Sequence, residues 1–335
     1  MQTPRLRFTF MTINLRVLNT MNWWYRKKLR GQTVWLRMAK FYYSFLKKNY
    51  LKKNYFVNAS ALDVKEVNRQ CIDPSNVIVK CSFKDKDYFL HSTSKSLIEN
   101  YAHKHGVWEP NLAKFIHSIL NNKNKKGLFI DIGANIGATT IPQAVSFPHI
   151  NFLCIEAHPT VFELLKANIN LNSLDNVCCI NKAVSNAANG NKVDFYAQKS
   201  DASNLGLSSL QLNKDIQDYD VLSVESIKVD ALDDAIDTKV FIIKADTQGS
   251  ELDVFQSCVH IIEKHYPIII FEYEEGYHDS PTRMREDITN FFENLGYAFY
   301  TVPTSENVMF RLTLKDFYHG DIVGIPMSAC GAPKK

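Results

Sequence analysis

The feature that most constrains the fold is a series of short, uninterrupted apolar runs that alternate with amphipathic stretches from Gly127 onward. An apolar run without polar alternation indicates a strand that is buried on both faces, as in a parallel sheet. Strands that alternate with helices predict a doubly wound α/β fold with a mostly parallel, seven-stranded sheet. The runs cover residues 128–132, 152–155, 177–180, 240–243 and 268–271.

Between these runs, apolar residues recur three and seven positions apart, which predicts helices that each bury one face. The sets are Phe162, Leu165 and Ile169, then Leu252, Phe255 and Val259, then Ile288, Phe291 and Leu295. After Gly296 the alternation stops. Residues 297–302 and 308–312 predict a closing antiparallel hairpin, and residues 321–325 a further short strand.

Upstream of the main domain, expected over residues 127–328, we expect an accessory segment over residues 61–126. Residues 77–83 and 88–91 alternate around a Lys-Asp-Lys-Asp turn, which is typical of a β-hairpin. Two helical stretches, 96–104 and 110–120, follow.

The first 60 residues form a basic, aromatic leader. Residues 1–62 contain 13 Lys or Arg and no Asp or Glu, whereas the rest of the chain is acidic on balance. Three interpretations stay open: peripheral contact with an anionic membrane surface, a targeting peptide, or an extension upstream of Met11 or Met21. The sequence contains no run of 18 apolar residues, so it predicts no membrane-spanning helix. Arg16 interrupts the stretch that would resemble a signal peptide.

The seven cysteines include no C-x-x-C pair, which favours a reducing compartment such as the cytoplasm over a disulfide framework. No spacing of His and Cys indicates a metal site. The acidic body also argues against nucleic acid on the main domain, because that would need a basic face.

The strongest functional signal is Asp131-Ile-Gly-Ala-Asn-Ile-Gly137, directly after the first buried run. Gly133 is expected to make a tight turn, and Gly137 to let the backbone approach a ligand. The loop lies at the carboxyl end of a strand, where open α/β sheets bind ligands. Glu156 ends the next strand, and a carboxylate there accepts hydrogen bonds from ribose hydroxyls.

The loop favours S-adenosyl-L-methionine over a dinucleotide. A dinucleotide fingerprint has the spacing G-x-G-x-x-G, which brings a pyrophosphate onto a helix N-terminus. Here the spacing is G-x-x-x-G, and the carboxylate of Asp131 would repel a pyrophosphate but suits an amino group and a sulfonium. We therefore expect Asp131, Gly133, Asn135, Gly137 and Glu156 to bind this cofactor. The alternative is an aspartate that only caps the next helix.

A second cluster follows the fourth run. Lys244 lies in a segment expected to be buried, and a buried lysine is costly unless paired. Asp246, Glu251 and Glu272 are its candidate partners. A hydroxyl must lose its proton on methylation, so we predict Asp246 as the base, with Lys244 and Glu272 beside it and His278 as second choice. An ion network that only fixes the loop stays open, with the rate arising from alignment.

Three further segments are expected to border the site. Ala183 and Val184 follow the third strand, where backbone contacts with adenine and an ordinary strand end are both open. Glu109 opens a helix and either caps it or contacts the cofactor. Ser208 and Ser209 lie in a polar stretch that is a lid, an acceptor-binding loop or plain surface.

Between about residues 108 and 302 the chain resembles the FkbM family of methyltransferases. The glycine loop combined with Lys244-Ala-Asp-Thr-Gln-Gly-Ser-Glu251 is more specific than the loop alone. The resemblance implies a class I, Rossmann-like fold and methyl transfer from S-adenosylmethionine, commonly to a hydroxyl of a sugar or secondary metabolite. Ala157 and Gln248 depart from the family, which often has proline and glutamate there. Further matching pieces are Trp108-Glu-Pro110, Leu165-Lys-Ala-Asn-Ile-Asn-Leu-Asn172, Ala183-Val-Ser185, Ser208-Ser-Leu210 and Pro267-Ile-Ile-Ile-Phe-Glu272.

Two functions stay open from the sequence. The first is O-methylation of a glycan, a lipid-linked sugar or a small metabolite. The second is a non-catalytic S-adenosylmethionine-fold module that the basic leader recruits. The chain has no Pro-Cys dipeptide for cytosine C5 methylation, and Asp246 is not followed by the prolines typical of base amino-group methylation. No pattern identifies the acceptor or the oligomeric state.

Overall fold

The computed structural model describes residues 77–92, 97–123, 126–186, 189–198, 208–211, 219–303, 309–313, 316 and 319–327. The expected basic leader over residues 1–60 lies outside the described residues. The strands are β1 Val77–Phe83, β2 Lys86–Ser92, β3 Leu128–Ile132, β4 Asn151–Ile155, β5 Val177–Ile180, β6 Ala183–Val184, β7 Lys192–Gln198, β8 Tyr219–Ile227, β9 Val240–Ala245, β10 Ile268–Glu274, β11 Tyr297–Thr301 and β12 His319–Pro326. The helices are α3 Leu97–His105, α4 Pro110–Asn121, α5 Thr140–Ser146, α6 Pro159–Leu171, α7 Glu251–Gln256, α8 Val259–His265 and α9 Pro281–Asn294, with 3-10 turns η3 Val229–Ala235 and η4 Glu275–Tyr277.

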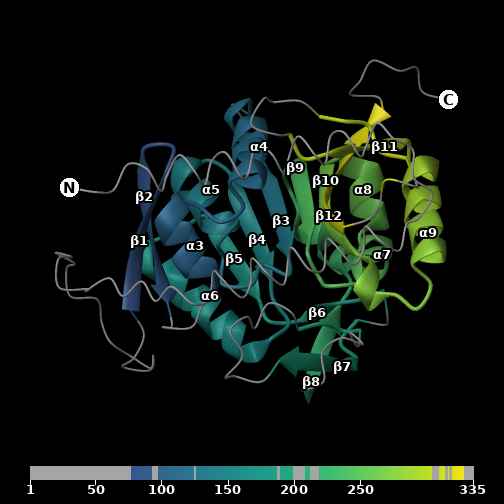
Figure 1. Cartoon of the computed structure of the whole chain (residues 1–335), viewed down its shortest axis with the longest axis horizontal. Coiled ribbons are helices and arrows are strands. Elements are labelled where there is room, and N and C mark those ends of the chain that lie inside the picture. Colours follow the sequence, from purple (N-terminus) through teal and green to yellow (C-terminus); the bar gives the residue numbers. More distant parts are fainter. Residues whose placement is uncertain are drawn as a thin grey trace, which may run out of the picture. The chain divides into compact units, whose positions relative to one another are not determined.

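The centre of the fold is a seven-stranded sheet in the order β11-β12-β10-β9-β3-β4-β5. The pairs β4–β5, β3–β4, β3–β9 and β9–β10 are parallel, as the uninterrupted apolar runs predict. All five residues of β3 are buried, which confirms the expectation that this strand is covered on both faces. The doubly wound α/β fold is therefore confirmed (Figure 1).

The sequence predicted the wrong partner for the strand over residues 297–302. β12 pairs antiparallel with both β10 and β11, so the second strand of the closing hairpin is His319–Pro326 rather than residues 308–312. Arg311 makes only an isolated bridge with Tyr300. The reason is burial: Ile322 and Val323 are buried as a central strand requires, whereas Phe310 is 60% exposed.

Helices cover both faces of the sheet (Figure 1). On one face, Phe129, Phe152 and Ile242 pack with residues of α4 and α5. On the other face, Ile130 and Ile243 pack with residues of α7, α8 and α9. Because side chains alternate along a strand, Asp131 and Lys244 share the α4–α5 face with their apolar neighbours.

The helix predicted through Leu252, Phe255 and Val259 is two helices, α7 and α8. The break is caused by Asp230 in η3. Its carboxylate accepts hydrogen bonds from the backbone N–H groups of His260 and Ile261, each at 3.1 Å, and so caps the N-terminus of α8. This contact joins segments 30 residues apart, so local spacing does not reveal it.

The β1–β2 hairpin was predicted, but its turn is shorter than the sequence indicated. Lys84 and Asp85 alone form it, both with positive φ. β2 lies against α6, where the Asn168 Oδ1 atom accepts a hydrogen bond from the backbone of His91 at 2.7 Å, and the Asn168 amide donates to the carbonyl of Ile136 at 2.9 Å. One side chain thus joins the hairpin, α6 and the glycine loop.

The part of the sequence between β5 and β9 forms a second, three-stranded sheet in the order β6-β8-β7. β6 runs parallel to β8, and β7 runs antiparallel to it. None of the helices in the described residues has the length and apolar character needed to cross a bilayer.

Candidate active site

A cavity opens at the carboxyl ends of β3 and β4. The loops after β3, β4 and β9 form one side of the cavity, and β6, β7 and residues 208–210 form the other. Seven residues predicted from the sequence line it: Gly133, Asn135, Glu156, Ala183, Val184, Ser208 and Asp246.

Gly133 is where the loops after β3 and β9 meet. Its φ is +73°, and a Cβ atom there would lie 1.9 Å from the carbonyl oxygen of Asp246. Its N–H donates to the carbonyl of Ile155 at 2.9 Å. The predicted tight turn is present, and glycine is required by close contact between backbones as well as by φ.

Gly137 has a packing role that the sequence did not predict. Its φ is +87°, but a Cβ atom there would meet the side chains of Ile141 and Leu165 at 2.8 and 2.9 Å. Gly137 is not among the residues that line the cavity. It therefore allows the loop to pack against α5 and α6, and the close approach to a ligand stays a prediction.

Glu156 is buried at the end of β4 and faces the cavity. Its two carboxylate oxygens accept backbone hydrogen bonds from Asn135 and His158, each at 2.8 Å. Burial nevertheless raises the pKa of Glu156 to about 7. Each oxygen keeps a lone pair, so this carboxylate is oriented by the backbone and still able to accept hydrogen bonds from a ligand.

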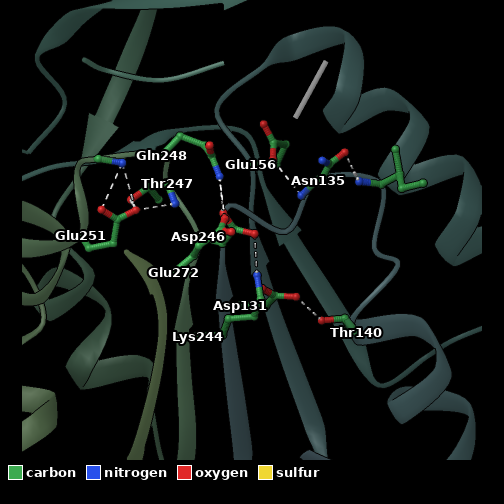
Figure 2. Close-up of polar contacts among 12 residues, drawn as sticks. Asp131, Asn135, Thr140, Glu156, Lys244, Asp246, Thr247, Gln248, Glu251 and Glu272 are labelled. Carbon is green, nitrogen blue, oxygen red and sulfur yellow. Dashed lines mark hydrogen bonds and ion pairs between the residues drawn. The ribbon is translucent and has the colours of Figure 1, made fainter. Parts of the chain in front are cut away.

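A row of polar contacts links β3 to the loop after β9 (Figure 2). Asp131 is 1% exposed and accepts a hydrogen bond from the Thr140 hydroxyl at 2.6 Å. The Lys244 ammonium lies 3.7 Å from Asp131 Oδ1 and 3.3 Å from Asp246 Oδ2. Asp131 Oδ1 is buried and makes no hydrogen bond.

The charge of Lys244 depends on these carboxylates. Burial acts to lower the pKa of Lys244, but Asp246, Asp131 and Glu109 outweigh it and hold the pKa well above its usual value. The predicted pairing with Asp246 is confirmed. Glu251 and Glu272 do not pair with Lys244 within 4.0 Å, and Asp131 takes that place.

The Gln248 carboxamide connects the predicted carboxylates. Its Nε2 donates to Asp246 Oδ1 at 2.9 Å and to Glu272 Oε2 at 3.0 Å (Figure 2). Burial, followed by the charges of Asp246 and Asp321, raises the pKa of Glu272 to about 9. Glu272 therefore lies near Asp246, as predicted, and the Gln248 carboxamide bridges the two carboxylates.

Two further carboxylates reach this cluster from distant elements. Asp321 of β12 stands opposite Glu272 in the sheet register. Glu109 is the N-cap residue of α4 at φ +45°, but its side chain makes no capping hydrogen bond. Burial raises the pKa of Glu109 to about 8, with Asp321 and Asp246 adding to the shift. Sequence reasoning missed Asp321, because only the insertion of β12 beside β10 brings it here.

The matches to known proteins agree with this architecture. The family model of the methyltransferase FkbM domain matches residues 131–299, half of the chain. The chain belongs to the FkbM methyltransferase family. No curated protein matches it.

Solved structures similar to this FkbM methyltransferase are distant. A methyltransferase FkbM from Methylobacillus flagellatus is 17% identical with a TM-score of 0.40, over 66% of this chain and 49% of that one. A putative caffeoyl-CoA O-methyltransferase from Staphylococcus aureus is 12% identical with a TM-score of 0.40, over 70% and 93%. This FkbM chain thus spans about half the length of the first structure, and its chemistry must be argued from its own site.

In this FkbM methyltransferase, Glu251 fastens the loop rather than the lysine. It is 1% exposed, and its carboxylate accepts hydrogen bonds from the backbone N–H groups of Thr247 and Gly249 at 3.0 and 3.1 Å. His278, the second candidate for a base, stacks on Tyr273 with ring centroids 5.3 Å apart. Tyr273 belongs to the core on the opposite face of the sheet from Lys244, so the geometry does not support His278 as the base.

The Ser208–Ser209 segment is attached to the same loop. The Ser209 hydroxyl, 1% exposed, donates to the carbonyl of Gln248 at 2.7 Å. Ser208 and Leu210 line the cavity. Ser208 and Leu210 are therefore part of the cavity wall, and the interpretations of the longer polar stretch stay predictions. In the described residues, no group of three or more His, Cys, Asp or Glu has the arrangement of a metal site.

Proposed function

We propose that this chain uses S-adenosyl-L-methionine to methylate a hydroxyl group of a glycan, a lipid-linked sugar or a small metabolite. The observation that carries the proposal is the charge at the carboxyl ends of β3, β9 and β10. Five carboxylates gather there around Lys244: Glu109, Asp131, Asp246, Glu272 and Asp321. The ionised carboxylates of this cluster favour a cationic ligand and repel a phosphate, and a cation bound there would lower the raised pKa values of Glu109 and Glu272.

The cavity divides into parts that suit the parts of this cofactor. Glu156 is placed to accept hydrogen bonds from the ribose hydroxyls. Ala183 and Val184 are buried beside the cavity and would contact the adenine ring. Asp246 lines the cavity near the acidic cluster, where the amino group and sulfonium would be stabilised. Asp131 would act through its charge from below the cavity surface, because its carboxylate is buried with one oxygen free of hydrogen bonds.

S-Adenosylmethionine would supply a methyl group on a positively charged sulfur. Asp246 is the proposed base, because its side chain is 32% exposed and faces the cavity. Lys244 and Gln248 each hold one of its oxygens, so the carboxylate is oriented to take the proton that an acceptor hydroxyl loses.

Titration calorimetry tests the cofactor. We expect wild-type protein to bind S-adenosylmethionine and S-adenosylhomocysteine but not NAD. Asp131→Asn removes a charge without changing size, and should weaken S-adenosylmethionine binding by about tenfold or more, since a lost charge-assisted contact costs about 1.5–3 kcal/mol. Asp175→Asn, at an exposed position, is the matched control. Binding of NAD, or no binding of S-adenosylmethionine at saturation, would contradict the proposal.

A labelled-methyl assay tests the reaction. Protein, S-adenosylmethionine and fractionated extract of the source cell should give labelled product and S-adenosylhomocysteine. Asp246→Asn should lower this rate at least about 100-fold if it removes the base. Binding of the cofactor with no transfer to any fraction would favour the non-catalytic module instead.

A further inference from the structure

The loop between β9 and α7 has a backbone that few residues adopt. Gln248 has a φ of +54° and Gly249 a φ of +101°. A Cβ atom on Gly249 would lie 2.5 Å from the Cβ of Tyr277, so the loop is packed tightly from outside. Gln248 is 8% exposed, although glutamine is a long polar side chain. A buried carboxamide is costly unless it forms hydrogen bonds.

The Gln248 carboxamide donates hydrogen bonds to two carboxylates. Its Nε2 has two hydrogens, and each meets a carboxylate: Asp246 at 2.9 Å and Glu272 at 3.0 Å. Without a donor between them, two such carboxylates would repel or share a proton. Gln248 therefore bridges the two acids with its own two hydrogens, so neither a shared proton nor a metal ion is needed between them.

Asp246 is held from two sides as a result. Gln248 donates to Oδ1, and Lys244 donates to Oδ2 at 3.3 Å. The two donors come from different elements, so together they fix the rotation of the carboxylate. The charged groups around it are Lys244 of β9, Asp131 of β3, Glu272 of β10, Asp321 of β12, Glu109 before α4, Glu156 after β4 and Glu251 of α7.

Gln248 is itself held by the cavity wall. The Ser209 hydroxyl donates to the Gln248 carbonyl at 2.7 Å, and the Thr247 carbonyl lies 3.2 Å from the same hydroxyl. The Ser209 Oγ atom also accepts the backbone N–H of Gln211 at 3.0 Å. These bonds fix the left-handed backbone that turns the carboxamide toward Asp246.

We infer that Gln248 is a positioning residue for methyl transfer: its carboxamide orients Asp246 toward the cavity and keeps it separate from Glu272. Ser209 holds Gln248 in the conformation that this requires. The inference rests on the proposed function, in which Asp246 takes the proton of the acceptor hydroxyl.

The experiment compares two substitutions of nearly unchanged size. Gln248→Met removes both donated hydrogen bonds without adding charge. Gln248→Glu donates one hydrogen bond while protonated, and becomes a third carboxylate beside Asp246 and Glu272 once ionised. Gln256→Glu, at an exposed position of α7, is the matched control for the added charge. Each protein is assayed with S-adenosylmethionine and the acceptor fraction from pH 6 to 9.

We expect wild type and Gln256→Glu to share one pH profile. Gln248→Met should lower the rate at saturating S-adenosylmethionine about 30-fold across the range, with cofactor affinity within about fivefold of wild type. Gln248→Glu should stay within about tenfold of wild type at pH 6 and fall at least about 100-fold below it at pH 9. A purely structural role would not give a loss that depends on pH.

Two results would overturn the inference. One is a wild-type rate and pH profile in both Gln248 variants. The other is a loss of S-adenosylmethionine binding that accounts for the whole decrease in rate, since Gln248 would then act on the cofactor and not on Asp246. Failure of the proposed function is distinguishable, because wild-type protein would itself not bind S-adenosylmethionine.

Discussion

At the scale of single residues, Gly133 offers a sharp test of the site. A Cβ atom there would lie 1.9 Å from a backbone oxygen of Asp246, and φ is +73°. Gly296 has φ +77° with nothing within 4 Å of the same position. Both alanine variants have unfavourable φ, at about 1–2 kcal/mol each, but only Gly133→Ala also forces two loops apart.

We therefore expect Gly133→Ala to unfold at a clearly lower denaturant concentration than Gly296→Ala, and to bind S-adenosylmethionine at least about tenfold more weakly than wild type. Urea unfolding and calorimetry measure the two effects. Equal stability of the two variants would show that the loops have room to separate.

Residues of the site were predictable where their role is local. The acids Asp131, Glu156 and Asp246 follow from their places in or just after buried runs, near the carboxyl ends of strands. Asp321 and Gln248 were not predicted as members of the cluster, because their partners lie on other strands. Gly137 was assigned to ligand contact because a sequence does not show what a glycine packs against.

At the scale of elements, Asn168 of α6 joins three segments. It is 0% exposed, and its amide group bonds to the backbone of His91 and of Ile136. Asn168→Ala would leave both backbone groups without this partner. We expect a loss of about 2–4 kcal/mol in the free energy of unfolding.

Asn170→Ala is the control, because Asn170 is exposed on the same helix and in the same motif. Its effect should stay within about 0.5 kcal/mol. Urea unfolding followed by circular dichroism compares the two variants, and similar midpoints would contradict the role given to Asn168.

The existence of most elements followed from the sequence, but their order in space did not. β3, β4, β5 and β9 were predicted to within a few residues because uninterrupted apolar runs are unambiguous. The partner of β11 was misassigned, and the break between α7 and α8 was missed. Both depend on contacts made after the chain folds back on itself.

At the scale of the whole molecule, the acidic cluster gives stability a definite dependence on pH. Burial raises the pKa of Glu272 to about 9 and of Glu109 to about 8. The folded protein thus holds protons that the unfolded chain releases above about pH 4.5. This stabilisation is complete below that pH and is lost as the pH rises through 8 to 9.

We expect the Tm of the ligand-free protein to fall by several degrees between pH 7 and 9. Glu272→Gln, which imitates the protonated acid, should flatten that decline. Differential scanning calorimetry of both proteins is the measurement. A Tm that rises over this range, or an equal slope in the variant, would contradict the raised pKa of Glu272.

The position of β12 has a consequence for synthesis of the protein. This strand contains residues 319–326, yet it lies between β10 and β11 and brings Asp321 to the site. A nascent chain emerges from the ribosome N-terminal end first, so the strands that flank this gap are made before the one that fills it. The last corner of the acidic cluster is therefore completed only after both strands that flank β12 have been synthesised.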